Sequence, residues 1–189
     1  MKKILGKFVL FISGWKSDYE TDFDITKCVM IAAPHTSNWD LLYAIAVFWK
    51  YNINAKFFIK NSYTKGLHGF IFRGIGAVGV DRSKNNKLVD YATELFEKNE
   101  ELVLLVPAEG TRKRAIRWKK GFYHIAKKAN VPVALGFLDY KNKIAGVGKL
   151  VHLSDNYEAD MNILEEFYKD KTAKHPELFN PEFYLRNKK

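Results

Sequence analysis

The sequence has almost none of the residues that build disulfides and metal sites. Cys28 is the only cysteine among 189 residues, so no disulfide can form within the chain, and its apolar neighbours are typical of a buried strand. Such a chain suits a reducing compartment. The five histidines do not combine with that cysteine in the spacing of a zinc site, so we expect no metal.

Motifs of several enzyme and membrane-protein classes are also absent. No Gly-x-Ser-x-Gly sequence, which presents the nucleophile of many serine hydrolases, occurs in the chain. The turn at 109–112 lacks the Gly-Lys-Ser/Thr ending of nucleotide-binding phosphate loops. The apolar run 4–12 is broken by Gly6 and Lys7, is far shorter than the ~20 residues that span a bilayer, and lacks a following signal-peptide cleavage site. We therefore expect neither a membrane span nor a signal peptide at this end.

Acidic residues are few compared with basic ones. The chain has 31 Lys and Arg against 21 Asp and Glu, a formal net charge of +10, which predicts an anionic partner: nucleic acid, an anionic membrane or a phosphorylated substrate. A nucleic-acid-binding surface would need aromatic and basic residues interleaved on exposed strands. Trp118 and Tyr123 do lie among basic residues, but Trp118 fits the core face of a helix better, so nucleic acid is not the expected partner.

Residues 1–16 carry the pattern of an amphipathic helix. Ile4, Phe8 and Ile12 recur at helical spacing, with lysines around them. The pattern fits a helix lying in a membrane interface, and it fits equally a terminal helix packed on the protein's own core. A helix at an anionic membrane surface would also account for part of the excess positive charge.

The remaining sequence alternates between strand and helix patterns. Strands are expected at 28–33, 55–59, within 74–82, and at 102–106, 131–140 and 144–153, and helices at 41–51, 66–73, 88–96, 118–129 and 161–168. The last two strands flank Lys141-Asn142 as a hairpin does. We predict a single α/β domain over 1–170, with a central mixed β-sheet flanked by helices, an acidic solvated connector from Asp18 to Asp24, and a C-terminal tail at 171–189.

The most reactive group of the sequence follows the strand at 28–33 directly. His35 and Asp40 fall at a strand-to-helix turn, where α/β proteins place reactive groups. On one straight helix two residues five apart point about 140° apart, so the pair can meet only if His35 precedes the helix and Asp40 lies in its first turn. They would then form an imidazole base oriented by a carboxylate. The alternative is a capping box with Ser37 as N-cap and Asp40 as its partner.

Two further groups also follow predicted strands. The turn Glu109, Gly110, Thr111, Arg112 combines a residue suited to tight turns, a hydroxyl and a guanidinium suited to phosphate. It opens a run, residues 112–128, with eight basic residues and no acidic one. Arg82 ends the short strand within 74–82, where a surface ion pair with Asp81 is the simpler explanation.

Together these groups resemble the blocks of the glycerolipid acyltransferase family, which acylates 1-acylglycerol 3-phosphate. A His, four residues and an Asp match at His35 and Asp40, a short strand closing on Arg matches at Arg82, and Glu-Gly-Thr-Arg matches at 109–112. A fourth block beginning Val-Pro matches at 131–133. The order and spacing agree over about residues 1–170. Two positions depart from the pattern: Ala108 replaces a proline before Glu109, and Ala77 replaces a glycine.

The resemblance implies a function and a location. His35 would be the general base, with Asp40 orienting it, and Arg82 with Glu109, Gly110, Thr111 and Arg112 would bind the acceptor's phosphate. The acyl donor would be a thioester of coenzyme A or acyl carrier protein, the acceptor a lysophospholipid, and no cofactor would be needed. Backbone N–H groups at the following helix would stabilise the oxyanion. The protein would be cytoplasmic and bound peripherally to the inner face of an anionic membrane. An amino-acid lipid or a lipid A precursor remains an alternative acceptor.

Overall fold

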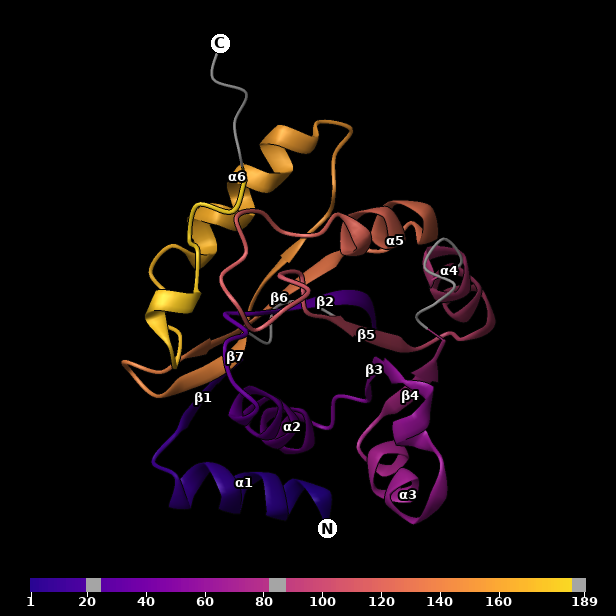
Figure 1. The fold of residues 1–189 in the computed structure, drawn as a ribbon, viewed down its shortest axis with the longest axis vertical. Coiled ribbons are helices and arrows are strands. Elements are labelled where there is room, and N and C mark those ends of the chain that lie inside the picture. The colour runs from indigo at the N-terminus through magenta and orange to yellow at the C-terminus, as the bar shows by residue number, and fades with distance from the viewer. Residues whose placement is uncertain (20–24, 82–87, 185–189) are drawn as a thin grey trace.

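The computed structural model describes residues 1–19, 25–81 and 88–184. In this part of the chain a seven-stranded sheet runs through the middle of the molecule, in the order β1-β7-β6-β2-β5-β3-β4 (Figure 1). Its strands are β1 Lys16–Tyr19, β2 Lys27–Ala33, β3 Ala55–Lys60, β4 Ala77–Val80, β5 Leu102–Val106, β6 Val133–Asp139 and β7 Ile144–Val151. The mixed α/β fold predicted from the sequence is confirmed.

The strand directions explain where the sheet is mixed. β2 pairs in parallel with both β5 and β6, and β3 pairs in parallel with β4 and β5. The hairpin predicted around Lys141-Asn142 is present: β6 and β7 are antiparallel, and β1 runs parallel to β7 at the edge. The carboxyl ends of β2, β3, β4, β5 and β6 therefore share one edge of the sheet.

Helices cover both faces of the sheet. On one face lie α4 Leu88–Lys98, α5 Gly121–Ala129 and α6 Tyr157–Tyr168; on the other lies α2 Trp39–Tyr51, with α1 Lys2–Ile12 packed behind it and α3 Gly66–Gly74 beside β3 and β4 (Figure 1). Alternate residues of each central strand serve the two sides. In β5, Leu102 and Leu104 join the core with α4 and α5, whereas Val103 and Leu105 join the core with α2.

Helix α1 has two apolar faces. Its inner face presents Gly6 and Leu10, which are buried against α2, and a Cβ on Gly6 would come within 2.5 Å of the Ala46 carbonyl oxygen. Its outer face exposes five apolar side chains, Ile4, Leu5, Phe8, Phe11 and Ile12. The two interpretations of the sequence pattern, core packing and an exposed apolar face, thus describe opposite sides of one helix.

Two local predictions are wrong. The acidic connector predicted from Asp18 to Asp24 is wrong at its start, because residues 16–19 form the edge strand β1, in which Ser17 pairs with Ala145 of β7. Long-range pairing with β7 outweighs the weak strand pattern of the stretch itself. The rest of the predicted connector, residues 20–24, lies outside the described residues. Trp118 was expected within a helix, but α5 begins at Gly121. Trp118 is nevertheless buried, because its ring stacks on Phe183 with centroids 3.5 Å apart.

The C-terminal segment 172–184 returns to the domain. Phe179 and Phe183 are buried in the core with α5 and α6, and the Arg114 side chain donates to the Phe179 carbonyl at 2.9 Å. His175 N–H donates to Thr36 Oγ1 at 3.2 Å. The segment therefore contacts both the turn after β2 and the loop before α5.

Candidate active site

The site lies where the carboxyl ends of β2 and β5 meet. Ile31 of β2 is in register with Val106 of β5, so the turns that follow these neighbouring strands lie side by side. From β2 the chain passes through α2 to β3, whereas from β5 it passes through α5 back to β6. The two connections run in opposite directions along the strand order, and their helices lie on opposite faces of the sheet. Such a reversal of direction opens a crevice at the strand ends, the usual position of ligand sites in α/β sheets.

His35 and Asp40 face each other across this turn. His35 lies before α2 and Asp40 in its first turn, and His35 Nδ1 is 3.2 Å from Asp40 Oδ2. The imidazole is partly exposed, with 26% of its side-chain surface accessible, whereas the carboxylate is almost fully buried. With Nδ1 directed at the carboxylate, Nε2 is the nitrogen available to a ligand. The sequence motif thus brings an imidazole against a buried carboxylate, the arrangement that a base oriented by an acid would need.

Asp40 also caps the turn that it occupies. Its Oδ2 accepts the N–H groups of Thr36 and Ser37, each at 2.8 Å, while Ser37 Oγ accepts the Trp39 N–H at 3.2 Å. Asn38, not Ser37, is the N-cap of α2, but the bond from the Ser37 N–H to Asp40 and the His–Asp contact are both made by the same carboxylate. The N–H groups of Thr36, Ser37 and Trp39 are therefore engaged within the turn itself.

The second carboxylate oxygen of Asp40 accepts a hydrogen bond from a residue far along the chain. Tyr140 directly follows β6, and its hydroxyl donates to Asp40 Oδ1 at 2.6 Å. No local pattern in the sequence points to Tyr140, because it lies 100 residues from Asp40 and ends an ordinary predicted strand. The pairing of β6 beside β2 brings the two together.

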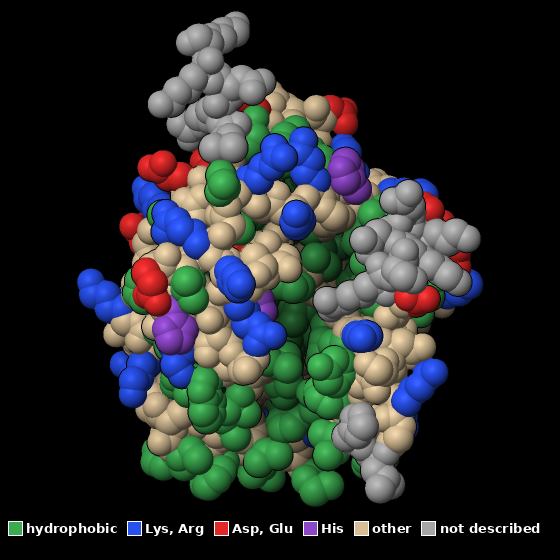
Figure 2. Space-filling view, viewed as in Figure 1, with side chains coloured by type: hydrophobic (Ala, Val, Ile, Leu, Met, Phe, Trp, Pro, Cys, Tyr) green, Lys and Arg blue, Asp and Glu red, His purple; other side chains and the backbone are tan. Residues whose placement is uncertain are grey.

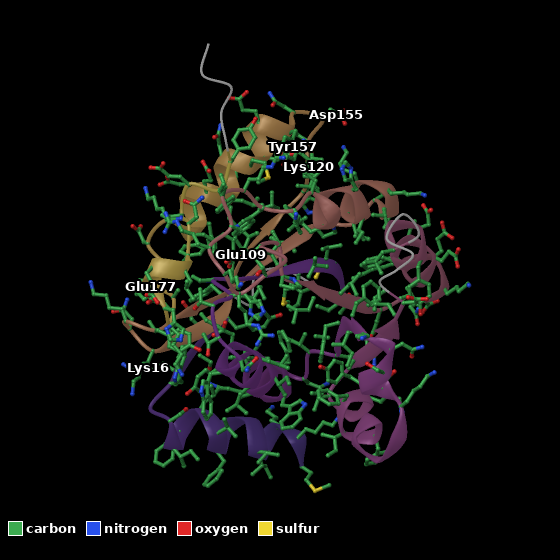
Figure 3. The ribbon with its side chains drawn as sticks, in the orientation of Figure 1. Lys16, Glu109, Lys120, Asp155, Tyr157 and Glu177 are labelled. Carbon is green, nitrogen blue, oxygen red and sulfur yellow. The ribbon has the colours of Figure 1, made fainter. Side chains whose placement is uncertain are left out.

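Glu109 lies beneath the His35 turn. Its side chain is 2% exposed, and its Oε1 accepts the His35 N–H at 2.6 Å. Figure 3 shows Glu109 in the interior of the molecule, whereas Asp155 and Glu177 lie at the surface. Burial raises the pKa of Glu109 to about 8, the His35 N–H opposes this, and the Asp40 charge adds to it. Glu109 therefore contacts the His35 turn rather than the open surface.

The rest of this turn is exposed. Gly110 adopts a φ of +69°, a conformation that favours glycine, and Thr111 Oγ1 accepts the Lys113 N–H at 3.1 Å. Arg112 lies at the cavity described below. Ala108, the departure from the family's proline, is buried, and its carbonyl accepts the Lys119 N–H at 2.8 Å. Arg82 lies outside the described residues; Ala77, the other departure, is buried in β4.

A largely apolar cavity of about 350 Å³ begins at His35 and Asp40 and runs between the sheet and α2. Arg112 lies on its wall, and most of the other side chains are apolar, among them Leu41, Ala44, Phe48, Phe57 and Leu105. Figure 2 shows hydrophobic side chains lining a hollow on this side of the molecule. The volume is within the range of small-molecule sites. The arrangement is suited to a ligand with an apolar chain and a polar end near His35 and Arg112.

Sequence comparison identifies the group of proteins to which the chain is related. Residues 20–134 match the family described as Acyltransferase, a range that contains both the His35–Asp40 pair and the 109–112 turn. The chain belongs to the acyltransferase family. Among curated proteins no match was found.

The fold of this acyltransferase also has a solved counterpart. The structure of the 1-acyl-sn-glycerophosphate (LPA) acyltransferase PlsC from Thermotoga maritima superposes with a TM-score of 0.62 at 17% sequence identity, covering 89% of this chain and 75% of that one. The likeness extends the shared fold beyond the family match, to most of the chain.

The described part of the acyltransferase offers no metal-binding cluster. Within residues 1–19, 25–81 and 88–184, no three His, Cys, Asp or Glu side chains come together as ligands. None of the helices in these ranges is both long and apolar enough to cross a bilayer.

The raised pKa of Glu109 predicts a pH-dependent stability. Its carboxyl titrates near 4.5 in the reference state and near 8 in the folded protein, so the folded state binds the proton more tightly. Stability is therefore favoured below about pH 4.5 and declines as the pH rises to about 8. Glu109→Gln keeps an oxygen acceptor but cannot ionise. Urea unfolding should show wild type losing stability relative to this variant across that range; a difference independent of pH would contradict the assignment.

Proposed function

We propose that the protein transfers an acyl chain from an acyl thioester to the hydroxyl of a lysophospholipid such as 1-acylglycerol 3-phosphate. One observation carries the proposal: the His35–Asp40 pair stands at the mouth of an apolar cavity that Arg112 also lines. A base, a site for an apolar chain and a guanidinium for phosphate are the three elements that this reaction needs. Membership of the acyltransferase family and the fold shared with PlsC support the same reaction class.

The geometry suggests how the reaction proceeds. Nε2 of His35 takes the proton from the acceptor hydroxyl while Nδ1 remains directed at Asp40. The hydroxyl oxygen attacks the thioester carbonyl carbon and forms a tetrahedral intermediate. Its collapse breaks the carbon–sulfur bond, and the imidazolium returns the proton to the leaving thiolate. The attack is direct, so neither a covalent acyl-enzyme nor a cofactor is required.

The residues of the 109–112 turn have different proposed roles. Arg112, together with Arg82, is proposed to hold the acceptor's phosphate, with Gly110 and Thr111 shaping the turn that presents Arg112. We assign Glu109 a different part from the one suggested by the family resemblance. Because it is buried and accepts the His35 N–H, it acts as a positioning residue for the catalytic turn rather than as a phosphate contact.

The first test removes the base. His35→Ala should lower kcat by about 10²–10⁴-fold, the usual contribution of a positioned proton acceptor. Asp40→Asn should also lose activity, since it leaves the imidazole with a neutral partner. The matched control is His124→Ala on α5, where the histidine is exposed. Turnover of His35→Ala equal to that of this control would refute the mechanism.

The second test asks whether Arg112 binds phosphate. Arg112→Ala should weaken apparent affinity for a phosphorylated acceptor by about 10-fold or more, as expected for loss of a charge-assisted hydrogen bond. Affinity for the dephosphorylated acceptor should hardly change. Arg117→Ala is the control, because Arg117 belongs to the same basic run and is exposed, but is not among the cavity-lining residues. Equal losses with both acceptors would exclude phosphate recognition by Arg112.

We also propose that the protein binds peripherally to the inner, cytoplasmic face of an anionic membrane. The outer face of α1 exposes Phe8, Phe11 and Ile12, and hydrophobic side chains gather along this lower edge of the molecule in Figure 2. Helix α3 adds exposed Phe70 and Ile71, and it lies next to α1, since Lys2 Nζ donates to the Gly74 carbonyl at 3.0 Å. Apolar insertion with surrounding lysines is typical of interfacial helices.

The third test is liposome binding. Serine substitutions at Phe8 and Phe11, or at Phe70 and Ile71, should weaken binding to vesicles of phosphatidylglycerol and phosphatidylcholine, most visibly at high salt, where the apolar contribution dominates. These positions are exposed, so the fold should survive. Ile163→Ser on α6, across the sheet, is the control. Unchanged binding of both double variants would place the membrane contact elsewhere, and preference for duplex DNA at physiological salt would favour the nucleic-acid alternative.

A further inference from the structure

We propose that Tyr140 is a positioning residue for the catalytic pair, acting through Asp40. This inference rests on the proposed role of His35 as base. The Tyr140 hydroxyl donates to Asp40 Oδ1 at 2.6 Å, while Oδ2 of the same carboxylate faces His35 Nδ1 at 3.2 Å. The two oxygens therefore have separate partners, and the orientation of the carboxylate is determined from both sides.

The ring of Tyr140 is itself held in place. It lies edge-on to Trp15, with centroids 4.8 Å apart, and Trp15 stacks on Tyr43 of α2 at 4.3 Å. The backbone N–H of Tyr140 donates to the Thr172 carbonyl at 2.8 Å. Aromatic packing and this bond leave the hydroxyl little freedom to leave Asp40. The donor is thus pre-positioned by Trp15, which directly precedes β1, by Tyr43 of α2 and by the C-terminal segment.

The hydroxyl can act only as a donor here. Burial, the hydrogen bond to Asp40 and the Asp40 charge all raise the pKa of Tyr140, which favours the protonated hydroxyl. The hydroxyl proton of Tyr140 stabilises negative charge on Oδ1 of Asp40, and the backbone N–H groups of Thr36 and Ser37 stabilise negative charge on Oδ2. The other ionisable groups that bear on this cluster are Glu109, whose pKa is raised by burial and by the Asp40 charge, and Tyr43, which contributes to the raised pKa of Tyr140.

Removing the hydroxyl should have two effects on catalysis. Asp40 would stay beside His35 through the Thr36 and Ser37 N–H groups but would lose the donor that fixes the angle of its carboxylate, so kcat should fall by about 10-fold, the effect of losing one hydrogen bond to a charged group. KM should change little, because Tyr140 does not line the cavity. The remaining carboxylate would also stabilise the imidazolium more strongly. The acid limb of the kcat/KM profile should then move to higher pH, by about half a unit or more.

The experiment compares three Tyr→Phe variants. Tyr140→Phe keeps the ring and its aromatic contacts. Tyr43→Phe makes the same change in the same aromatic cluster, at a hydroxyl with no hydrogen bond to Asp40. Tyr123→Phe removes a buried tyrosine–aspartate bond far from the site, the 2.9 Å contact with Asp160. Thermal melts establish that each variant is folded, and pH–rate profiles are then measured for all three and for wild type.

A second readout separates this inference from the proposed function. The His35 imidazole is titrated by NMR in the substrate-free protein, so the result does not depend on which acceptor is used. The inference predicts an upward shift of the titration in Tyr140→Phe only, even if no lysophospholipid is acylated. A His35 titration and pH profile equal to wild type, or equal changes in all three variants, would overturn it.

Discussion

The carboxylate of Asp40 is the group on which the arrangement of the site depends. It is 4% exposed and accepts hydrogen bonds from two backbone N–H groups of its own turn and from the Tyr140 hydroxyl, while it faces His35. A buried carboxylate is stable only when such donors surround it. The same bonds also fix the turn that carries His35, so the contacts that compensate for the burial of Asp40 also set the position of the imidazole.

A second buried carboxyl supports the turn from below. Glu109 accepts the His35 N–H, and its raised pKa reflects burial close to a charged neighbour. The strand order makes this possible, because β2 and β5 are adjacent and parallel and end at the same edge. The cavity then begins where the two turns meet and runs between the sheet and α2. Fold and reaction are connected through these two strand ends.

Local pattern and long-range pairing contributed differently to what could be predicted. The apolar runs identified the central strands and the hairpin, and the His-x4-Asp spacing predicted the contact between His35 and Asp40, because both depend on residues close in sequence. Edge strand β1 was missed because its pairing with β7 lies far along the chain. The contacts of Tyr140 and Glu109 were missed for the same reason: each meets its partner only through the strand order. The packing of Phe183 on Trp118 likewise has no local signature.

The most direct test of the account is to identify the reaction product. Purified protein is incubated with a labelled acyl thioester and a panel of acceptors: lysophosphatidate, its dephosphorylated counterpart, an amino-acid lipid and a lipid A precursor. The account predicts a new ester on the phosphorylated lysophospholipid, release of one thiol for each ester, and no labelled protein when the acceptor is omitted. Preferred acylation of an acceptor without phosphate, or an acyl-enzyme formed before acceptor is added, would contradict it.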